Sequence, residues 1–167
     1  MEKAEKYVKM ALGMGAEDSK VISINDIVFD PRPLLICMWG CGEWGRHWSC
    51  PGTPKALKPW EAERILKRYD WGILIHTGDF ELAREISFEV EMKAFFDGYP
   101  LAFSIFDCCR CKTCAYPDPC TFPKKSRPEM QTMGIDVYST VKKQGLPIKP
   151  LETRDEKPNY YAIVLIE

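Results

Sequence analysis

The sequence predicts a single α/β (α+β) domain over residues 1–167, in which a mixed β-sheet of about four to five strands is flanked by helices. Segments with helical periodicity alternate with short apolar runs that are typical of strands. A chain of 167 residues that is 46% hydrophobic is long and apolar enough to bury one core. Neither an internal repeat nor a domain-separating linker interrupts the chain, so we expect one domain carrying two cysteine-rich metal-binding loops.

The first predicted elements precede a cysteine loop at residues 37–54. Residues 3–12 predict a surface helix, because apolar side chains recur on one helical stripe. The stripe consists of Tyr7, Val8, Ala11 and Leu12. The apolar positions 22–24 and 27–29 predict two short strands or a hairpin.

A helix is predicted to begin at Pro59, since proline suits the first helical position. Its expected apolar face contains Trp60, Ile65, Leu66 and Tyr69. Residues 71–76 predict a buried strand, and Asp79 is placed to cap the helix that follows. In that helix an apolar residue recurs every four positions, at Leu82, Ile86, Val90 and Ala94. Residues 101–106 predict another strand, with a right-handed crossover if the two strands are parallel neighbours.

The second cysteine loop, residues 107–123, follows that strand directly. Beyond it, Asp136 is placed to cap a helix that runs to Lys143. The last strand is predicted at residues 160–166, whose continuous apolar run is typical of a central strand.

Charge and hydropathy exclude two classes of partner. The net charge is −1, with 23 basic and 24 acidic residues interspersed, which predicts no nucleic-acid surface. No apolar run approaches the roughly 20 residues that span a bilayer, so we expect no membrane insertion. The charged first residues lack a secretory signal, which predicts a cytoplasmic protein with reduced thiols and disfavours disulfides.

The second cysteine group has the spacing C-x2-C-x2-C-x5-C, formed by Cys108, Cys111, Cys114 and Cys120. Three thiols at this interval suit an iron–sulfur cube, because each binds a different iron. The ferredoxin run differs in its last interval, and Pro123 lies three residues after the last cysteine. A structural zinc ion is the alternative, although zinc ribbons usually present two separated C-x2-C pairs. The adjacent Cys109 could replace Cys108 as a ligand or remain a separate thiol.

The first cysteine group, Cys37, Cys41 and Cys50, offers three thiols where a cube has four irons. His47 or Glu43 could occupy the remaining corner, or an exogenous ligand or substrate could bind there as to a Lewis acid. The two groups together predict one or two [4Fe-4S] clusters, with zinc as the alternative cofactor. If the groups meet at one site, a larger assembly becomes possible.

Other side chains near these groups have competing interpretations. Tryptophans 39, 44 and 48 either shield a cluster from water or belong to the core. His76, inside an apolar strand, is expected to be a hydrogen-bonded core residue. Arg127 either hydrogen-bonds cluster sulfur or a partner carboxylate, or has a structural role such as pairing with Asp136.

The cysteine spacings and two further stretches resemble those of the predicted metal-binding protein family catalogued as domain of unknown function 2284. The stretches are Trp48-Ser-Cys-Pro51 and Arg127-Pro-Glu-Met130 running into Met133-Gly-Ile-Asp-Val137. The likeness covers most of the chain. It implies metal or iron–sulfur binding in a cytoplasmic protein of anaerobic archaea and bacteria, with no settled reaction. The chain departs from the family pattern at Phe106-Asp107 and at Glu129.

The expected function is electron transfer, or the handling of sulfide or another small ligand at the three-cysteine cluster. A redox or sulfur-transfer protein is the expected partner. An oxidoreductase or sulfur-transfer activity is compatible with this site, whereas the alternative is a zinc-stabilised adaptor without catalysis. The radical S-adenosylmethionine signature is not met, since its third position is Trp44, and no nucleotide or protease motif is present.

Overall fold

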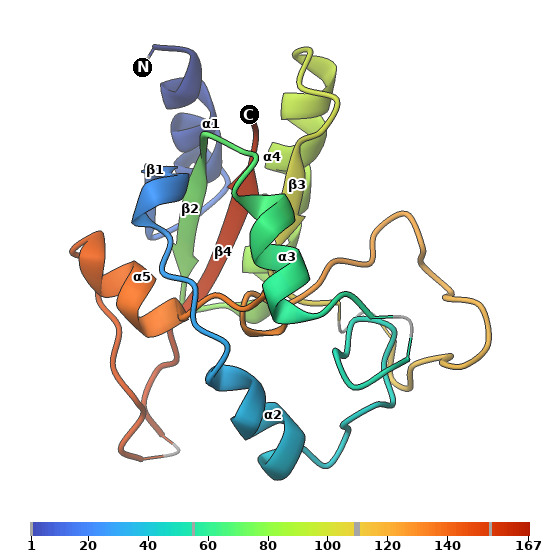
Figure 1. Ribbon diagram of the computed structural model, residues 1–167. Coiled ribbons are helices and arrows are strands. Elements are labelled where there is room, and N and C mark those ends of the chain that lie inside the picture. Colours follow the sequence, from blue (N-terminus) through green and yellow to red (C-terminus); the bar gives the residue numbers. More distant parts are fainter. Residues whose placement is uncertain (1, 55, 109–110, 154) are drawn as a thin grey trace.

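The computed structural model describes residues 2–54, 56–108, 111–153 and 155–167, which form five α-helices around a four-stranded sheet (Figure 1). The helices are α1 (Glu2–Gly13), α2 (Pro33–Gly40), α3 (Pro59–Leu66), α4 (Phe80–Phe96) and α5 (Val137–Lys143). The strands are β1 (Asp18–Ser23), β2 (Trp71–Thr77), β3 (Phe103–Ile105) and β4 (Tyr160–Leu165). Two short 3-10 helices are η1 (Ile24–Asp26) and η2 (Gln131–Met133). The architecture is a single α+β domain.

The strand order is β1-β2-β4-β3, and every neighbouring pair is antiparallel. The prediction of a mixed sheet was therefore wrong. Strands β2 and β3 do run in the same direction, but β4 lies between them and pairs with both. The expected crossover between parallel neighbours is not formed, because the C-terminal strand occupies the place between them.

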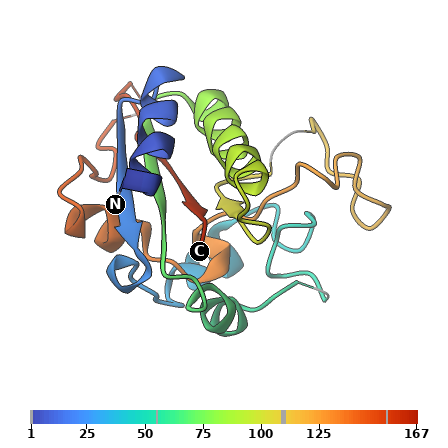
Figure 2. The same cartoon turned by 90° about the horizontal axis from the view of Figure 1, so that it is seen from above.

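Both faces of the sheet are buried under helices (Figure 2). Helices α1 and α4 cover one face, while α3, α5 and η2 cover the other. Side chains of β4 therefore alternate between two apolar cores, with Ile163 in one and Val164 in the other. This explains the uninterrupted apolar run and confirms the predicted central strand.

Helix boundaries agree with the capping signals in the sequence. Pro59 opens α3, and the Asp79 carboxylate accepts a hydrogen bond from the Leu82 N–H at 3.0 Å at the start of α4. The Asp136 carboxylate likewise accepts from the Ser139 N–H at 3.0 Å and caps α5. These bonds satisfy amide groups that a helix leaves without an intrahelical partner.

Three expectations for residues 22–66 were wrong or incomplete. Residues 22–29 form no hairpin: β1 begins earlier, at Asp18, and pairs with β2, while Phe29 makes an isolated bridge to Ile135. Helix α2 was not predicted, and it includes Cys37, which was placed in a loop. The apolar face of α3 was also misassigned, since Ile65 is 51% exposed and Ala62 is fully buried.

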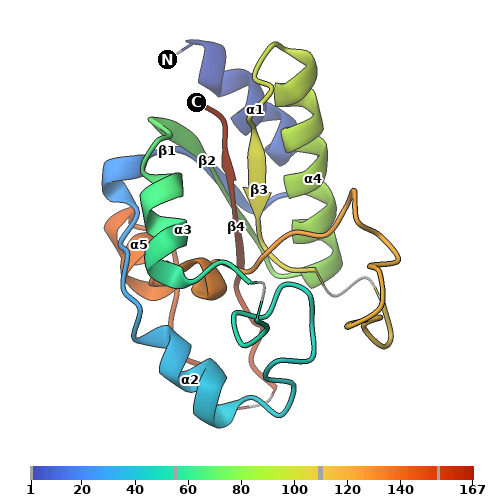
Figure 3. The same ribbon diagram turned by 45° about the vertical axis from the view of Figure 1, so that its right-hand side comes forward.

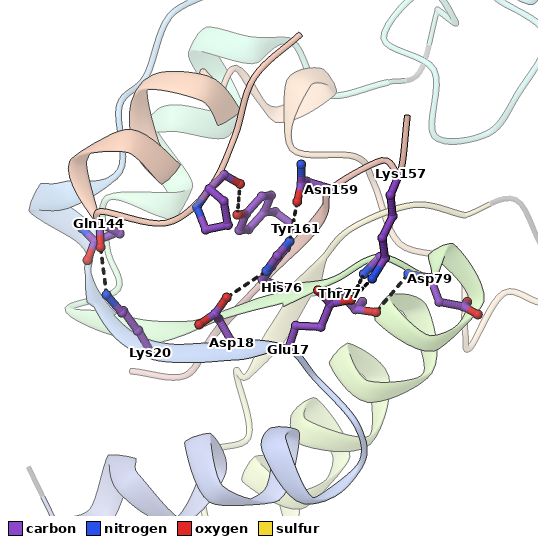
Figure 4. A network of polar contacts seen from close by, with 12 residues as sticks. Glu17, Asp18, Lys20, His76, Thr77, Asp79, Gln144, Lys157, Asn159 and Tyr161 are labelled. Atoms are coloured by element: carbon purple, nitrogen blue, oxygen red, sulfur yellow. Dashed lines mark hydrogen bonds and ion pairs between the residues drawn. The ribbon is translucent and has the colours of Figure 1, made fainter. Parts of the chain in front are cut away.

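His76 is a core residue with both ring nitrogens hydrogen-bonded, as predicted (Figure 4). Nδ1 lies 3.0 Å from the Asp18 carboxylate, and Nε2 lies 2.8 Å from the Asn159 side-chain oxygen. The ring stacks on Tyr161 at a centroid separation of 4.5 Å. These contacts give His76 a structural role.

Candidate metal centre

The first cysteine group lies at the end of α2 and in the loop that follows it. Cys37 is in the last turn of α2, and the N–H of Cys41 donates to the Cys37 carbonyl at 3.3 Å where the helix ends. Cys50 follows after a chain of turns. Figure 3 shows this segment near the carboxyl end of β3, at the opposite end of the domain from the chain termini.

The Cys50 sulfur accepts two backbone hydrogen bonds. The N–H of Gly45 lies 3.0 Å from Sγ, and the N–H of Gly52 lies 3.4 Å from it. Gly45 has φ +75°, a conformation that favours glycine, and a Cβ on Gly52 would lie 2.6 Å from the Trp44 ring. The loop therefore requires both glycines to bring amide donors to this sulfur, and such donors stabilise negative charge on a thiolate.

The second cysteine group begins directly after β3. Phe106 forms an isolated parallel bridge with Glu129, which brings the two ends of this loop together. The Cys108 Sγ lies 3.1 Å from the Ser126 Oγ. Cys109, whose role the sequence left open, lies outside the described residues.

The two loops contact each other through Trp48. Its indole N–H donates to the Asp118 carbonyl at 2.9 Å, and its ring lies edge-on to Tyr116 at 5.1 Å. A side chain of the first loop thus binds the second loop, although 70 residues separate Trp48 from Asp118. The views in Figures 1 and 3 agree in placing the loops together.

One cavity of about 250 Å³ lies between the loops and is lined by both cysteine groups. The lining cysteines are Cys37, Cys41, Cys50, Cys108, Cys111, Cys114 and Cys120. All seven are free thiols, of which only Cys41 is classed as exposed. Further lining side chains include Trp44, Trp48, Glu43, His47, Asp107 and Glu129. The structure therefore brings together every described cysteine that the sequence proposed as a ligand.

The lining side chains surround a volume and do not converge on a point. Among the described residues, no three histidine, cysteine, aspartate or glutamate side chains are close enough to hold one metal ion. A single zinc ion needs four ligands at about 2.0–2.3 Å from one centre. The described side chains therefore do not form such a mononuclear site.

Negative charge is disfavoured at two cavity residues. Burial raises the pKa of the Cys37 thiol, and the neighbouring Glu129, Cys41 and Cys50 raise it further. Burial, followed by repulsion from Asp107, raises the pKa of Glu129 to about 7. A bound cation would offset both effects, because it attracts the thiolate and the carboxylate.

A buried ion pair fixes the chain where it returns from the second loop. Arg127 binds the Glu91 carboxylate in two places, one of them from Nε at 2.8 Å. Glu91 is 6% exposed and also accepts from the Ser104 N–H and hydroxyl. The Arg127 guanidinium lies 5.2 Å from the centre of the Phe103 ring. Arg127 thus has the structural role, but its carboxylate partner is Glu91 and not Asp136.

The remaining candidates are divided between the cavity and the surface. His47 lines the cavity and lies 3.4 Å from the Glu43 carboxylate. Trp44 and Trp48 line it as well, consistent with shielding, whereas Trp39 is 82% exposed on α2. Trp39 therefore belongs to neither the cavity nor the core.

Three acidic residues of this region were not singled out as site residues from the sequence: Glu91, Asp107 and Glu129. Glu91 had a detectable signal in the sequence, because it is a charged residue next to Val90, which belongs to the apolar repeat of α4. A glutamate there is rarely buried without a partner. Asp107 and Glu129 had no comparable signal, since their nearness to the thiols depends on how the loop closes.

The fold and the cavity define an α+β protein with a thiol-rich site of the kind that binds metals. A family model matches residues 20–166, and the chain belongs to that family, described as predicted metal-binding protein (DUF2284). This confirms the resemblance found in the sequence. No curated protein and no solved structure gave a significant match. Within the described residues, no helix is both long and apolar enough to cross a membrane.

Proposed function

We propose that the chain is an iron–sulfur protein whose cofactor binds in the cavity between the two loops. The observation that supports this most strongly is that seven free thiols from segments far apart in sequence line one cavity. The proposed ligands are Cys108, Cys111, Cys114 and Cys120 at one [4Fe-4S] cluster, and Cys37, Cys41 and Cys50 at a second. Since both groups face the same cavity, the two clusters would lie close together or be part of one larger assembly.

Three features favour an iron–sulfur cluster over a single zinc ion. The C-x2-C-x2-C spacing from Cys108 to Cys114 suits a cube. The cavity of about 250 Å³ exceeds the space of a lone ion, since one water occupies only about 30 Å³. The two backbone amides that donate to the Cys50 sulfur are the kind of contact that sets the reduction potential of a cluster.

The four-cysteine site suits electron transfer, because every iron would be held by a thiolate and none would be open to substrate. The three-cysteine site leaves one corner for another ligand, which suits the binding of sulfide or a small anion. When bound, the cofactor would supply one-electron redox chemistry. A redox or sulfur-transfer protein is the partner that this chemistry requires.

The protein environment suits a redox site that is partly shielded from water. Trp44 and Trp48 are half-buried and line the cavity, and Trp48 also ties the two loops together. Among the seven described cysteines, Cys41 is the exposed one, so electrons or a small ligand would enter on its side. Shielding by apolar rings limits hydrolysis of a cluster and influences its potential.

The test is the metal content of single variants purified without oxygen. Cys41→Ala and Cys114→Ala remove one proposed ligand from each loop and are expected to lower bound iron and the visible absorption of the cluster. Thr113→Ala is the matched control, because Thr113 is exposed in the same loop and has no proposed ligand role. Equal iron content in all three variants and the wild type would contradict the proposed ligands.

The functional step is tested by a redox titration of the wild-type protein. A reversible one-electron change in visible absorption is expected, and Cys114→Ala should remove or shift it. If the protein contains iron but shows no reversible reduction within the potential range of common low-potential mediators, electron transfer would be contradicted. Small-ligand binding would then remain as the function of the site.

A further inference from the structure

We infer that the carboxylate of Glu129 is an oxygen ligand of the metal centre and occupies the corner that Cys37, Cys41 and Cys50 leave open. This inference rests on the proposed function and adds a fourth protein ligand to it. Glu129 lines the same cavity as the three thiols.

The backbone of Glu129 is fixed on both sides of the side chain. Phe106 pairs with Glu129 in a parallel bridge at the end of β3. The Glu129 carbonyl accepts hydrogen bonds from the Thr132 hydroxyl at 2.8 Å and from the Met133 N–H at 3.2 Å. A ligand must be held in position by its surroundings, and these contacts place Glu129 at the junction of β3 and η2.

The carboxylate of Glu129 has no hydrogen-bond donor among the residues that the structure describes. The residue is partly buried and lines the cavity, and its carboxylate oxygens are not fully buried. A partly buried carboxylate without a partner suits a metal ligand, since charges removed from water in proteins are paired or coordinate metals. The contrast is Glu91, whose buried carboxylate is bound by Arg127 and Ser104.

The lining of the cavity also suits a cation beside Glu129. Its carboxylate shares the cavity with seven thiols, and no described lysine or arginine lines this cavity. A metal centre beside Cys37 would offset the charge of the Glu129 carboxylate. The other two candidates for the open corner differ in this respect, since His47 and Glu43 contact each other and Glu43 also lies 3.8 Å from Arg46.

An oxygen ligand would give this corner a distinct reactivity. Carboxylate is a harder ligand than thiolate and binds iron of a cluster less strongly. One iron would therefore differ from the other three and would exchange its ligand most easily. This is the position at which a small anion would bind in place of the carboxylate.

Mössbauer spectroscopy of protein grown on iron-57 tests the inference on the wild-type chain. An iron with an oxygen ligand gives a separate doublet with a larger isomer shift than iron with thiolate ligands only. We expect such a doublet in the wild type and its loss in Glu129→Cys, which offers a fourth thiolate. A wild-type spectrum that contains only thiolate-ligated iron would overturn the inference.

Iron retention against a chelator provides the second measurement. Glu129→Gln keeps the shape of the side chain but removes its charge, and it is expected to release iron about tenfold faster or more. Glu89→Gln is the matched control, because Glu89 is exposed on α4, and it should not change the rate. Faster release in Glu43→Gln or His47→Ala, with Glu129→Gln unchanged, would assign the corner to a rival ligand and overturn the inference.

The failure of the inference can be distinguished from failure of the proposed function. Wild-type protein that holds zinc and no sulfide would contradict the iron–sulfur proposal. The role of Glu129 as a ligand would then be tested by measuring the zinc affinity of the variants. A weakening of about tenfold or more in Glu129→Gln, but not in Glu89→Gln, would support the carboxylate ligand. An unchanged affinity would overturn it. Protein that binds neither metal would overturn both proposals.

Discussion

Replacing Glu91 by alanine is expected to destabilise the protein far more than replacing an exposed glutamate of the same helix. The Glu91 carboxylate is bound by Arg127 and by both donors of Ser104, and its side chain is only 8% exposed. Its loss would leave the Arg127 guanidinium, which is 15% exposed, without its anionic partner.

The expected cost follows from these contacts. Removing one partner of a buried ion pair costs about 3–5 kcal/mol, because the other charge remains buried. Arg127 would keep hydrogen bonds to the carbonyls of Lys124 and Ser126, at 3.3 and 2.7 Å, which favours the lower end of that range. We therefore expect a loss of about 3 kcal/mol, which lowers the melting temperature by roughly 6–12 °C in a chain of this size.

The assay is urea unfolding followed by circular dichroism, with the wild type and variants in the same metal state. Glu89→Ala is the control on α4 and is expected to change the free energy of unfolding by less than about 0.5 kcal/mol. The double variant with Arg127→Met should cost less than the two single changes added together, since it removes the unpaired charge. A cost below about 1 kcal/mol for Glu91→Ala would mean that the pair with Arg127 does not stabilise the fold as a buried ion pair.

Three further outcomes are expected. Gly52→Ala should lower stability by about 1–3 kcal/mol and reduce metal content, because the new Cβ would lie 2.6 Å from the Trp44 ring; thermal unfolding and elemental analysis measure both. Asp79→Ala should cost about 1 kcal/mol in urea unfolding through loss of the α4 cap, with metal content unchanged. Metal removal should speed amide hydrogen exchange in residues 41–50 and 111–120 while β2 and β4 stay protected, and uniform exchange throughout would contradict a local role of the metal.

Helices α1, α3, α4 and α5 and the buried strands β2 and β4 were predictable because their signals are local. Asp79 and Asp136 mark helix starts through their own side chains, and the apolar repeat of α4 marks its buried face. Helix α2 was missed because its sequence is apolar throughout and therefore has no amphipathic pattern. In the structure its apolar side chains are largely exposed, with Ile36 at 75%.

The sheet order could not be read from the sequence. The apolar run of β4 fits any central position, and its pairing with both β2 and β3 depends on contacts between distant residues. Cysteine spacing within each loop predicted candidate ligands, but not that the two loops share one cavity. That convergence depends on contacts such as the bond from Trp48 to Asp118, which no local pattern announces.

The most direct test of the central claim is elemental analysis of the wild-type protein purified and kept without oxygen. We expect iron and acid-labile sulfide in near-equal amounts, with about four of each per chain for one [4Fe-4S] cluster and about eight for two. Stoichiometric zinc without sulfide, or cysteines oxidised in pairs with no metal, would contradict it.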